Sequence, residues 1–589
     1  MVLPRLSALR ELMQKYGVNA YIVPSTDPHQ SEYVPAFWER RKFLSGFTGS
    51  AGDVVVTGQR AALFTDSRYF IQAALELDGS TIELMKVGQP GTPSPQAWLI
   101  ANLSPGDVVG IDPRLHTATG ALALEQELEA AGISLVSIDD NLVDEIWEEQ
   151  PEPPLDPLVI WPVPFAGEER SAKLRRVYDA MAAHGVDTHV VSALDAIAWL
   201  LNIRCSDVEF NPVVIAYVLL SNEQCTLFVD PRKVTEQVAA ELGPDVKLAS
   251  YDAFPEALAN LEAEHVLLDQ GSASRWIVDM LGEETHFALG HSPITLMKAV
   301  KNPVELSGFA QAHLRDGVAM VRFIHWLHTE VPRGQVTELS AAAALEGFRS
   351  ELEYFRGLSF ETISAHGPHG AIVHYSATPE SNVPLTPQGF YLVDSGGQYL
   401  DGTTDITRTL ALGPATAEMK RLYTLVLRGH LDLAMALFPV GTAGKQLDTI
   451  ARKPLWDAGL NYSHGTGHGI GAYLNVHEGP HAISFYRCVG VPLEPGMVTS
   501  NEPGYYLEGA FGIRIENVLS VVESDVPGFL TFNDFTLCPY ERGCIDAALL
   551  EQRHLAHIDA YHARCRELLA PHLSEDERQW LTEATLPVS

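Results

Sequence analysis

Four carboxylates embedded in apolar segments constrain this chain more than any other feature of its sequence. Asp394 ends the strand-like run at residues 390–393, and Asp405 follows a Gly-Gly turn 405 − 394 = 11 residues later. A hairpin of that length can bring both carboxylates to one face, although aspartates at turns are also common in ordinary structure. Glu502 ends another such run, and Glu516 lies 516 − 502 = 14 residues later in an apolar segment. Buried unpaired carboxylates are costly unless cations neutralise them, so the set predicts a cation site.

A histidine- and glycine-rich segment at residues 462–480 supplies imidazoles for the same site. It holds His464, His468 and His477, with four glycines between positions 465 and 471. Glycine lets the backbone approach a ligand closely, and this density of glycine argues against a helical HxxxH zinc pair. Among the three histidines we therefore expect one metal ligand and separate proton-handling groups.

Arg514 is a candidate for orienting one of the carboxylates. It lies two residues before Glu516, so strand alternation places both side chains on the same face. An arginine in that position can hold the carboxylate through a hydrogen bond, and a plain buried Arg–Glu pair is the alternative.

The donor set predicts two divalent cations as cofactors. Two such ions balance the charge of four carboxylates, and one imidazole completes the set. Hard oxygen donors favour manganese, while zinc and cobalt also tolerate such sites. Two metals roughly 3.5–4 Å apart can hold a bridging hydroxide and polarise a carbonyl, which is the chemistry of a hydrolase.

The part of the chain before this site contains a weak internal repeat. A helical stretch leads through a glycine into an apolar strand that ends at an aspartate, first from Gly17 to Asp27 and again from Gly185 to Asp195. The glycine and the aspartate are ten residues apart in each copy. The segment ALFTD at 62–66 is answered by TLFVD at 226–230. The recurrence of helix, glycine turn and buried strand predicts two related α/β domains.

Three domains are expected from this organisation. They cover residues 1–150, 151–298 and 299–589, and the last of these carries the predicted site. The proline-rich segment 150–165 is expected to be a stiff linker between the first two domains, because proline removes hydrogen-bond donors and blocks helix.

Charge and composition limit the partners and the location of the protein. The 589-residue chain has a formal charge of −35 and a pI near 4.9, which disfavours nucleic acid and acidic membrane as partners. Its longest apolar run, residues 213–220, is shorter than the roughly 18 residues of a membrane span. The N-terminus lacks signal-peptide features, and the six cysteines form no CxxC pair and are expected to be free thiols. We therefore expect a cytoplasmic protein.

Three motifs carry a resemblance to a known family. They are DSGGQYLDGTTDITRT at 394–409, SHGTGHGIGAYLNVHEGP at 463–480 and NEPGYY at 501–506. In order and spacing they resemble the pita-bread metallopeptidases, which include methionine aminopeptidase, prolidase and Xaa-Pro aminopeptidase. The likeness is greatest to the large three-domain cytosolic Xaa-Pro aminopeptidases and extends over nearly the whole chain. It implies an α/β (α+β) fold, with two tandem creatinase-like N-terminal domains before a C-terminal pita-bread catalytic domain.

The resemblance also implies a ligand set. Asp394, Asp405, His468, Glu502 and Glu516 match the five metal ligands of the family. By this likeness, Asp405 and Glu516 bridge the two metals. Asp394 completes the shell of one metal, and His468 with Glu502 completes that of the other. Glu502 also takes the proton of the attacking water.

Further expectations follow from the same likeness. His374, in the motif GAIVHYSAT, lines the substrate pocket together with His464 and His477. The expected reaction is release of the N-terminal residue from peptides with proline in the second position, by attack of a hydroxide bridging two metals. Peptides with an N-terminal Xaa-Pro are the expected substrates, and the protein is expected to be a homodimer.

Other functions on this fold are also considered. A prolidase-like enzyme would cleave X-Pro dipeptides only, and the pair of N-terminal domains argues against it. Creatinase-type hydrolysis uses the fold without metals, and the complete ligand set argues against that. A catalytically inactive binding protein is the alternative from outside the enzyme class, and such relatives typically lose ligands.

Overall fold

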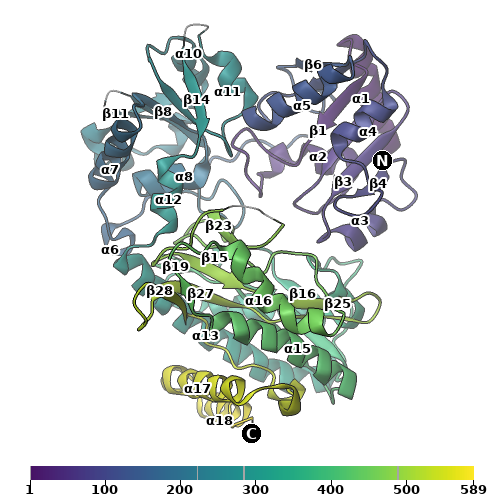
Figure 1. Ribbon diagram of the computed structural model, residues 1–589, viewed down its shortest axis with the longest axis vertical. Coiled ribbons are helices and arrows are strands. Elements are labelled where there is room, and N and C mark those ends of the chain that lie inside the picture. The colour runs from purple at the N-terminus through teal and green to yellow at the C-terminus, as the bar shows by residue number, and fades with distance from the viewer. Residues whose placement is uncertain (1, 222, 283–284, 487–489, 589) are drawn as a thin grey trace. The chain divides into compact units, whose positions relative to one another are not determined.

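The predicted repeat is present as two six-stranded sheets with one strand order, in a computed structural model that describes residues 2–588 apart from 222, 283–284 and 487–489 (Figure 1). The first sheet has the order β4 (Glu83–Lys86), β3 (Ala61–Thr65), β2 (Asp53–Thr57), β1 (Ala20–Val23), β5 (Val108–Ile111) and β6 (Ser134–Ser137). The second has the order β12 (Val246–Ser250), β11 (Gln224–Val229), β10 (Ala216–Ser221), β8 (Thr188–Val191), β13 (Val266–Asp269) and β14 (Phe287–Gly290).

The two sheets also agree in strand direction. In each sheet the central hairpin is antiparallel, as in β1–β2–β3 and β8–β10–β11, and the outer pairs are parallel. The helix that precedes each first strand is α1 (Val2–Lys15) in one copy and α7 (Arg170–Ala183) in the other. Strands β1, β3 and β8 are buried along their whole length, as the apolar runs in the sequence predict. The repeat seen in the sequence is thus confirmed by topology.

By contacts between residues, the chain divides into two units. One contains residues 1–162 and 168–295, with both sheets of the repeat, and the other contains residues 163–167 and 296–589. The segment expected to be a linker is partly regular structure. Val159–Ile160 forms strand β7, which pairs with β9 (Ile203–Arg204), and Val163–Ala166 forms helix α6. The domain boundaries at 150 and 298 remain predictions.

The second unit is built on antiparallel sheets, and the largest of them also has six strands. Its longest sheet has the order β21 (Phe438–Pro439), β28 (Phe529–Asp534), β27 (Asn517–Glu523), β24 (Val498–Asn501), β22 (Gly467–Gly469) and β23 (Glu478–Ile483). A second sheet has the order β16 (Ile363–His366), β17 (Phe390–Ser395) and β20 (Ile406–Ala411). Two further sheets contain β15 (Phe355–Leu358), β18 (Gly397–Tyr399) and β19 (Gly402–Thr403), and β25 (Gly504–Leu507) with β26 (Phe511–Arg514).

Long helices accompany these sheets. They are α13 (Pro303–Glu330), α14 (Glu338–Ser350), α15 (Ala417–Ala434), α16 (Gly444–Asp457), α17 (Gln552–Leu569) and α18 (Glu575–Ala584). Helix α13 begins at a capping box, in which Asn302 Oδ1 accepts from the backbone N–H groups of Val304 and Glu305, and the backbone N–H of Asn302 donates to Glu305 Oε2. Pro303 occupies the first helical position, where its missing N–H has no cost.

The remaining features of the fold are the state of the cysteines and the hydropathy of the helices. Cys205, Cys225, Cys538, Cys544 and Cys565 are free and buried, and Cys488 lies outside the described residues. Within the described part of the chain, no helix is both long enough and apolar enough to cross a bilayer.

Candidate metal centre

The five predicted ligands come from the two largest sheets of the second unit. Asp394 is the fifth residue of β17, and Asp405 immediately precedes β20, the antiparallel neighbour of β17. Glu502 directly follows β24, Glu516 directly precedes β27, and β24 pairs with β27. His468 lies in strand β22 and not in a helix, as the surrounding glycines predicted. Each strand pairing brings two of the carboxylates together, and the approach of the two sheets brings together ligands more than a hundred positions apart, such as Asp405 and Glu516.

Three of these residues form a compact donor cluster. The donor atoms of Asp405, His468 and Glu516 all lie within 4.8 Å of one another. His468 Nε2 is 3.4 Å from Asp405 Oδ2 and 3.5 Å from Glu502 Oε1. A single cation placed among them would be within reach of a nitrogen and several carboxylate oxygens.

Most of these carboxylates lie in the protein interior, where a negative charge is costly. Asp394, Asp405 and Glu516 are buried, and the Glu502 side chain is 18 % exposed. Burial raises the pKa of Asp394 to about 6, although Arg514 opposes this shift. Burial also raises the pKa of Glu502, and it raises that of Glu516 well above its usual range, with Asp405 adding to both shifts.

A cation would relieve this arrangement, and one atom points to it directly. Asp394 Oδ1 is buried and has no hydrogen-bond partner among the described residues. Buried carboxylate oxygens are normally hydrogen-bonded or bound to metal, so a lone pair left in the interior fits a metal ligand. The residues present therefore fit the two divalent ions that the family implies.

The His468 ring is oriented for ligation by its own backbone neighbourhood. Its Nδ1 donates a 3.0 Å hydrogen bond to Gly469 O, so in the neutral imidazole, the form that binds metal, the lone pair is on Nε2, the atom that faces Asp405 and Glu502. Burial opposes protonation, but the hydrogen bond to Asp405 and the charge of Glu502 raise the pKa of His468 to about 9. The ring is thus set in an environment that attracts positive charge.

Arg514 lies at the site, but its ion pair is with a different carboxylate. Its Nη2 donates to Asp394 Oδ2 at 2.7 Å, and its Nε donates to Thr407 Oγ1 at 3.2 Å. Thr407 Oγ1 in turn donates to Glu516 Oε2 at 2.7 Å. Arg514 and Glu516 do not alternate along one strand, because β26 ends at Arg514 and β27, in a different sheet, begins after Glu516.

The three other predicted histidines differ in how directly they are connected to the donor cluster. His464 Nδ1 donates to Gly465 O, so its Nε2 accepts from Tyr506 OH at 2.8 Å. The His477 ring lies 4.4 Å from the His468 ring, nearly perpendicular to it. The segment that carries His374 is anchored one residue earlier, because Arg514 Nη2 donates to Val373 O at 3.2 Å. His464 and His477 thus adjoin the cluster, and His374 is tied to it through the backbone.

Several residues of the site were not predicted from the sequence. Thr407 holds Glu516, Ser500 Oγ donates to Glu502 Oε1 at 3.1 Å, and Tyr506 OH accepts from Arg514 Nη1 at 2.6 Å. Thr407 and Glu516 are 109 residues apart, so no local pattern connects them. Thr407 does stand in the motif at 394–409 and Tyr506 in the motif NEPGYY, and these motifs were the available signals.

Comparison with protein families matches every major part of the chain. Residues 5–146 and 149–305 each match a creatinase/prolidase N-terminal domain, and residues 307–523 match metallopeptidase family M24. Residues 528–588 match the C-terminal region of that peptidase family. The predicted fold class, two creatinase-like domains before a pita-bread domain, is confirmed.

Individual relatives show to which branch of this peptidase family the chain belongs. A probable Xaa-Pro aminopeptidase P from Laccaria bicolor is 42% identical over 602 residues, covering 99% of this chain and 93% of the relative. One from Neosartorya fischeri is 43% identical over 610 residues, covering 99% and 92%. The chain belongs to the Xaa-Pro aminopeptidase P family. A crystal structure of another X-prolyl aminopeptidase, from Caenorhabditis elegans, superposes with a TM-score of 0.97 at 38% identity, over 100% of both chains. That Xaa-Pro aminopeptidase is described as a cytosolic enzyme with a di-nuclear active site.

Proposed function

We propose that the protein is a metal-dependent aminopeptidase that releases the N-terminal residue from peptides with proline in the second position. The observation that carries the proposal is the cluster of four carboxylates and His468, gathered in a chain that matches Xaa-Pro aminopeptidases from end to end. Prolidase-like cleavage of X-Pro dipeptides is the second candidate, because prolidase belongs to the same fold family.

The ligand roles are part of this proposal. By likeness to the family, Asp405 and Glu516 are the residues that would contact both ions, and their proximity to each other in the cluster with His468 is compatible with that role. Asp394 would complete one shell, in line with its unpartnered Oδ1, and His468 with Glu502 would complete the other. When bound, two divalent ions supply Lewis-acid activation of water and of the scissile carbonyl.

The side chains around the cluster would handle protons and hold the substrate. Glu502 would accept a proton from the attacking water, and Ser500 keeps its carboxylate oriented. His464, hydrogen-bonded to Tyr506, and His477, against the His468 ring, would contact the substrate carbonyl or the proline. His374 would line the same pocket. Arg514 would keep Asp394 in place as a ligand.

Substrate selection follows from the chemistry of the bond. The amide before proline has no N–H, so recognition rests on the shape of the ring and on the free N-terminal amine. The acidic surroundings of the site suit a cationic amine.

Three finer points belong to the proposal. Manganese is the expected metal because the donors are mostly carboxylate oxygens, with zinc and cobalt as alternatives. A cytoplasmic location is supported by the cytosolic relative and by the free buried cysteines. A homodimer is supported by three exposed aromatic side chains, those of Trp456, Phe485 and Tyr486. The Trp456 ring contacts the Phe485 ring, which contacts the Tyr486 ring.

The deciding experiment measures release of arginine from Arg-Pro-Pro after metal stripping and again after adding Mn²⁺. Activity that is lost on stripping and returns with Mn²⁺ would support both the reaction and the cluster. Hydrolysis of Arg-Pro but not of Arg-Pro-Pro would favour the dipeptidase. Full activity of the stripped protein would refute the metal-dependent mechanism.

A further inference from the structure

Arg408 is a fully buried guanidinium just behind the candidate metal centre. It lies in β20, three residues after Asp405, and it is 0 % exposed. Its Nη1, Nη2 and Nε groups all donate hydrogen bonds, and the acceptors are carbonyl, amide or hydroxyl oxygens. No carboxylate accepts directly from this guanidinium among the described contacts. A buried cation held only by dipoles is uncommon and depends on every acceptor being in position.

One side of the guanidinium holds the backbone around Glu516. Arg408 Nη1 donates to Glu516 O at 2.7 Å and to Thr407 O at 3.0 Å. Glu516 N donates to the same Thr407 O at 3.1 Å, and Thr407 Oγ1 donates to Glu516 Oε2. Arg408 Nη2 also donates to Asn517 Oδ1 at 2.8 Å. The backbone and side chain of Glu516 are therefore fixed by a short network that converges on Arg408.

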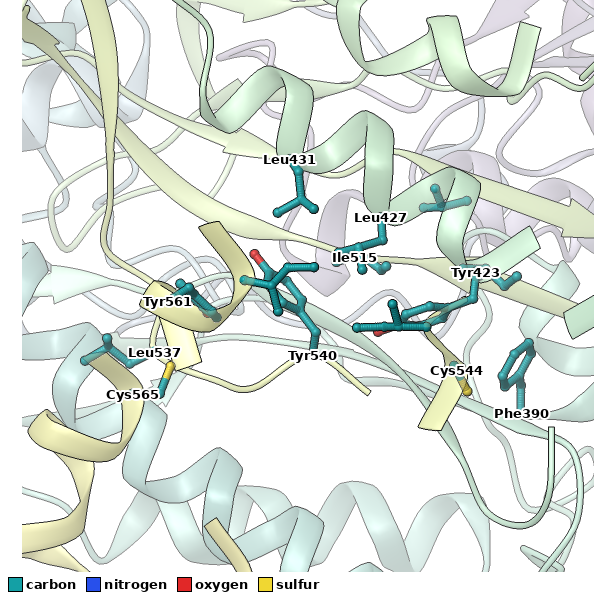
Figure 2. Packing of buried hydrophobic residues seen from close by; sticks show 14 of the residues in the cluster. Phe390, Tyr423, Leu427, Leu431, Ile515, Leu537, Tyr540, Cys544, Tyr561 and Cys565 are labelled. Carbon is teal, nitrogen blue, oxygen red and sulfur yellow. The ribbon is translucent and has the colours of Figure 1, made fainter. Parts of the chain in front are cut away.

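The other side of the guanidinium is bound by the C-terminal region, residues 528–588. Arg408 Nη2 donates to Cys538 O at 2.7 Å and to Tyr561 OH at 3.1 Å, and Nε donates to Pro539 O at 3.3 Å. Tyr561 OH closes the arrangement by donating to Cys538 O at 2.9 Å. Figure 2 shows Tyr561 beside Tyr540, with Ile515 of the metal-site segment close to the same group of side chains.

We propose that Arg408 is a positioning residue through which the C-terminal region holds Glu516 in its metal-binding geometry. This inference rests on the proposed metal centre. The planar fork of arginine reaches Glu516 O and the C-terminal carbonyls at the same time, whereas a lysine ammonium in the same place has one nitrogen and cannot span them. The C-terminal region thereby contributes to metal binding without supplying a ligand.

The test is the affinity of the metal-stripped protein for Mn²⁺ alone, measured by competition with a fluorescent chelator. Arg408→Lys is expected to weaken binding by roughly tenfold to a hundredfold, as loss of groups that support metal ligands typically does. Its kcat should fall while KM for Arg-Pro-Pro stays near the wild-type value. Tyr561→Phe removes one acceptor of the guanidinium and should shift the affinity in the same direction by less.

The matched control is Arg204→Lys in the N-terminal unit. Arg204 is also buried and donates to two carbonyls, Ala198 O at 2.9 Å and Ile203 O at 2.8 Å. That variant should keep the wild-type Mn²⁺ affinity even if it lowers the melting temperature. If Arg408→Lys fails to fold, Tyr561→Phe decides the matter. Wild-type Mn²⁺ affinity in the folded Arg408 and Tyr561 variants would overturn the inference about Arg408 but not the proposed function. A wild-type protein that binds no Mn²⁺ would overturn both.

Discussion

Buried charges are neutralised differently at two places in this molecule, one in each unit. In the N-terminal unit, Lys233 Nζ lies 2.6 Å from Asp207 Oδ2, with both side chains at most 3 % exposed, and the backbone N–H of Ile215 donates to the same oxygen. Each of these two charges is compensated by the other within the chain. In the second unit, four carboxylates share one guanidinium, that of Arg514, and the imidazole of His468.

The difference separates structural charges from functional ones. A buried ion pair that is locally neutral needs nothing further, so it indicates packing and not chemistry. A buried group of like charges is unstable by itself and implies a cation from outside the chain. The comparison predicts that changes at the carboxylate cluster alter metal binding and catalysis, whereas changes at the Lys233–Asp207 pair alter stability alone.

Replacement of Glu502 should give the largest effect. Glu502→Gln keeps the shape of the side chain and removes the proposed proton acceptor and one ligand charge. The rate of Arg-Pro-Pro cleavage should fall roughly 10²–10⁴-fold, since that is the usual contribution of a general base. The folded structure should be retained, as judged by circular dichroism. An unchanged rate would remove Glu502 from the mechanism.

Breaking the ion pair between Lys233 and Asp207 should have a large effect on stability. Lys233→Met leaves Asp207 buried without its cation, which costs about 3–5 kcal/mol of unfolding free energy. Urea unfolding measures this loss, and Mn²⁺ affinity should not change. The exposed pair of Lys42 with Glu39 provides the control, because Lys42→Met should cost about 1 kcal/mol or less. A Lys233 variant with weakened metal binding would contradict the comparison.

A smaller catalytic effect is expected from Arg514→Lys. Lysine keeps the charge but cannot bind Asp394, Thr407 and Tyr506 at once, so Asp394 should be held less firmly. Metal affinity should drop roughly tenfold to a hundredfold. Arg421→Lys changes an exposed pair with Glu418 and serves as the control, with no expected effect on affinity. Equal affinities in both variants would argue against a role for Arg514 in the site.

The smallest effect is a pH dependence of the stabilisation by metal. In the metal-free protein the pKa of Asp394 is raised to about 6, so the folded state binds this proton more tightly than the unfolded chain does. This group therefore lowers the stability of the metal-free protein as pH rises through about 6. Metal binding removes that penalty. The gain in melting temperature on adding Mn²⁺ should be larger at pH 7 than at pH 5. Asp394→Asn should show a shallower dependence, and a gain that is constant with pH would contradict the assignment.

The sequence was sufficient for the features that depend on local pattern. The apolar run before Asp394 predicted the strand that carries it, the glycines around His468 argued correctly against a helix there, and the repeat predicted two like sheets. It was insufficient where long-range pairing decides. The partner of Arg514 depends on a change of sheet between β26 and β27, and nothing near Arg408 in the sequence indicates acceptors 130 and 153 residues away. Such contacts are set by tertiary packing, which no short segment encodes.

The position of the acceptors of Arg408 has a consequence for the time course of synthesis. Glu516 leaves the site of peptide-bond formation 561 − 516 = 45 residues before Tyr561, which is about 2–9 s at roughly 5–20 residues per second. During that interval all five proposed ligands exist, but the network behind Glu516 is incomplete. The nascent chain therefore offers the metal a looser set of donors than the finished protein does, and tight loading is expected to follow release of the completed chain.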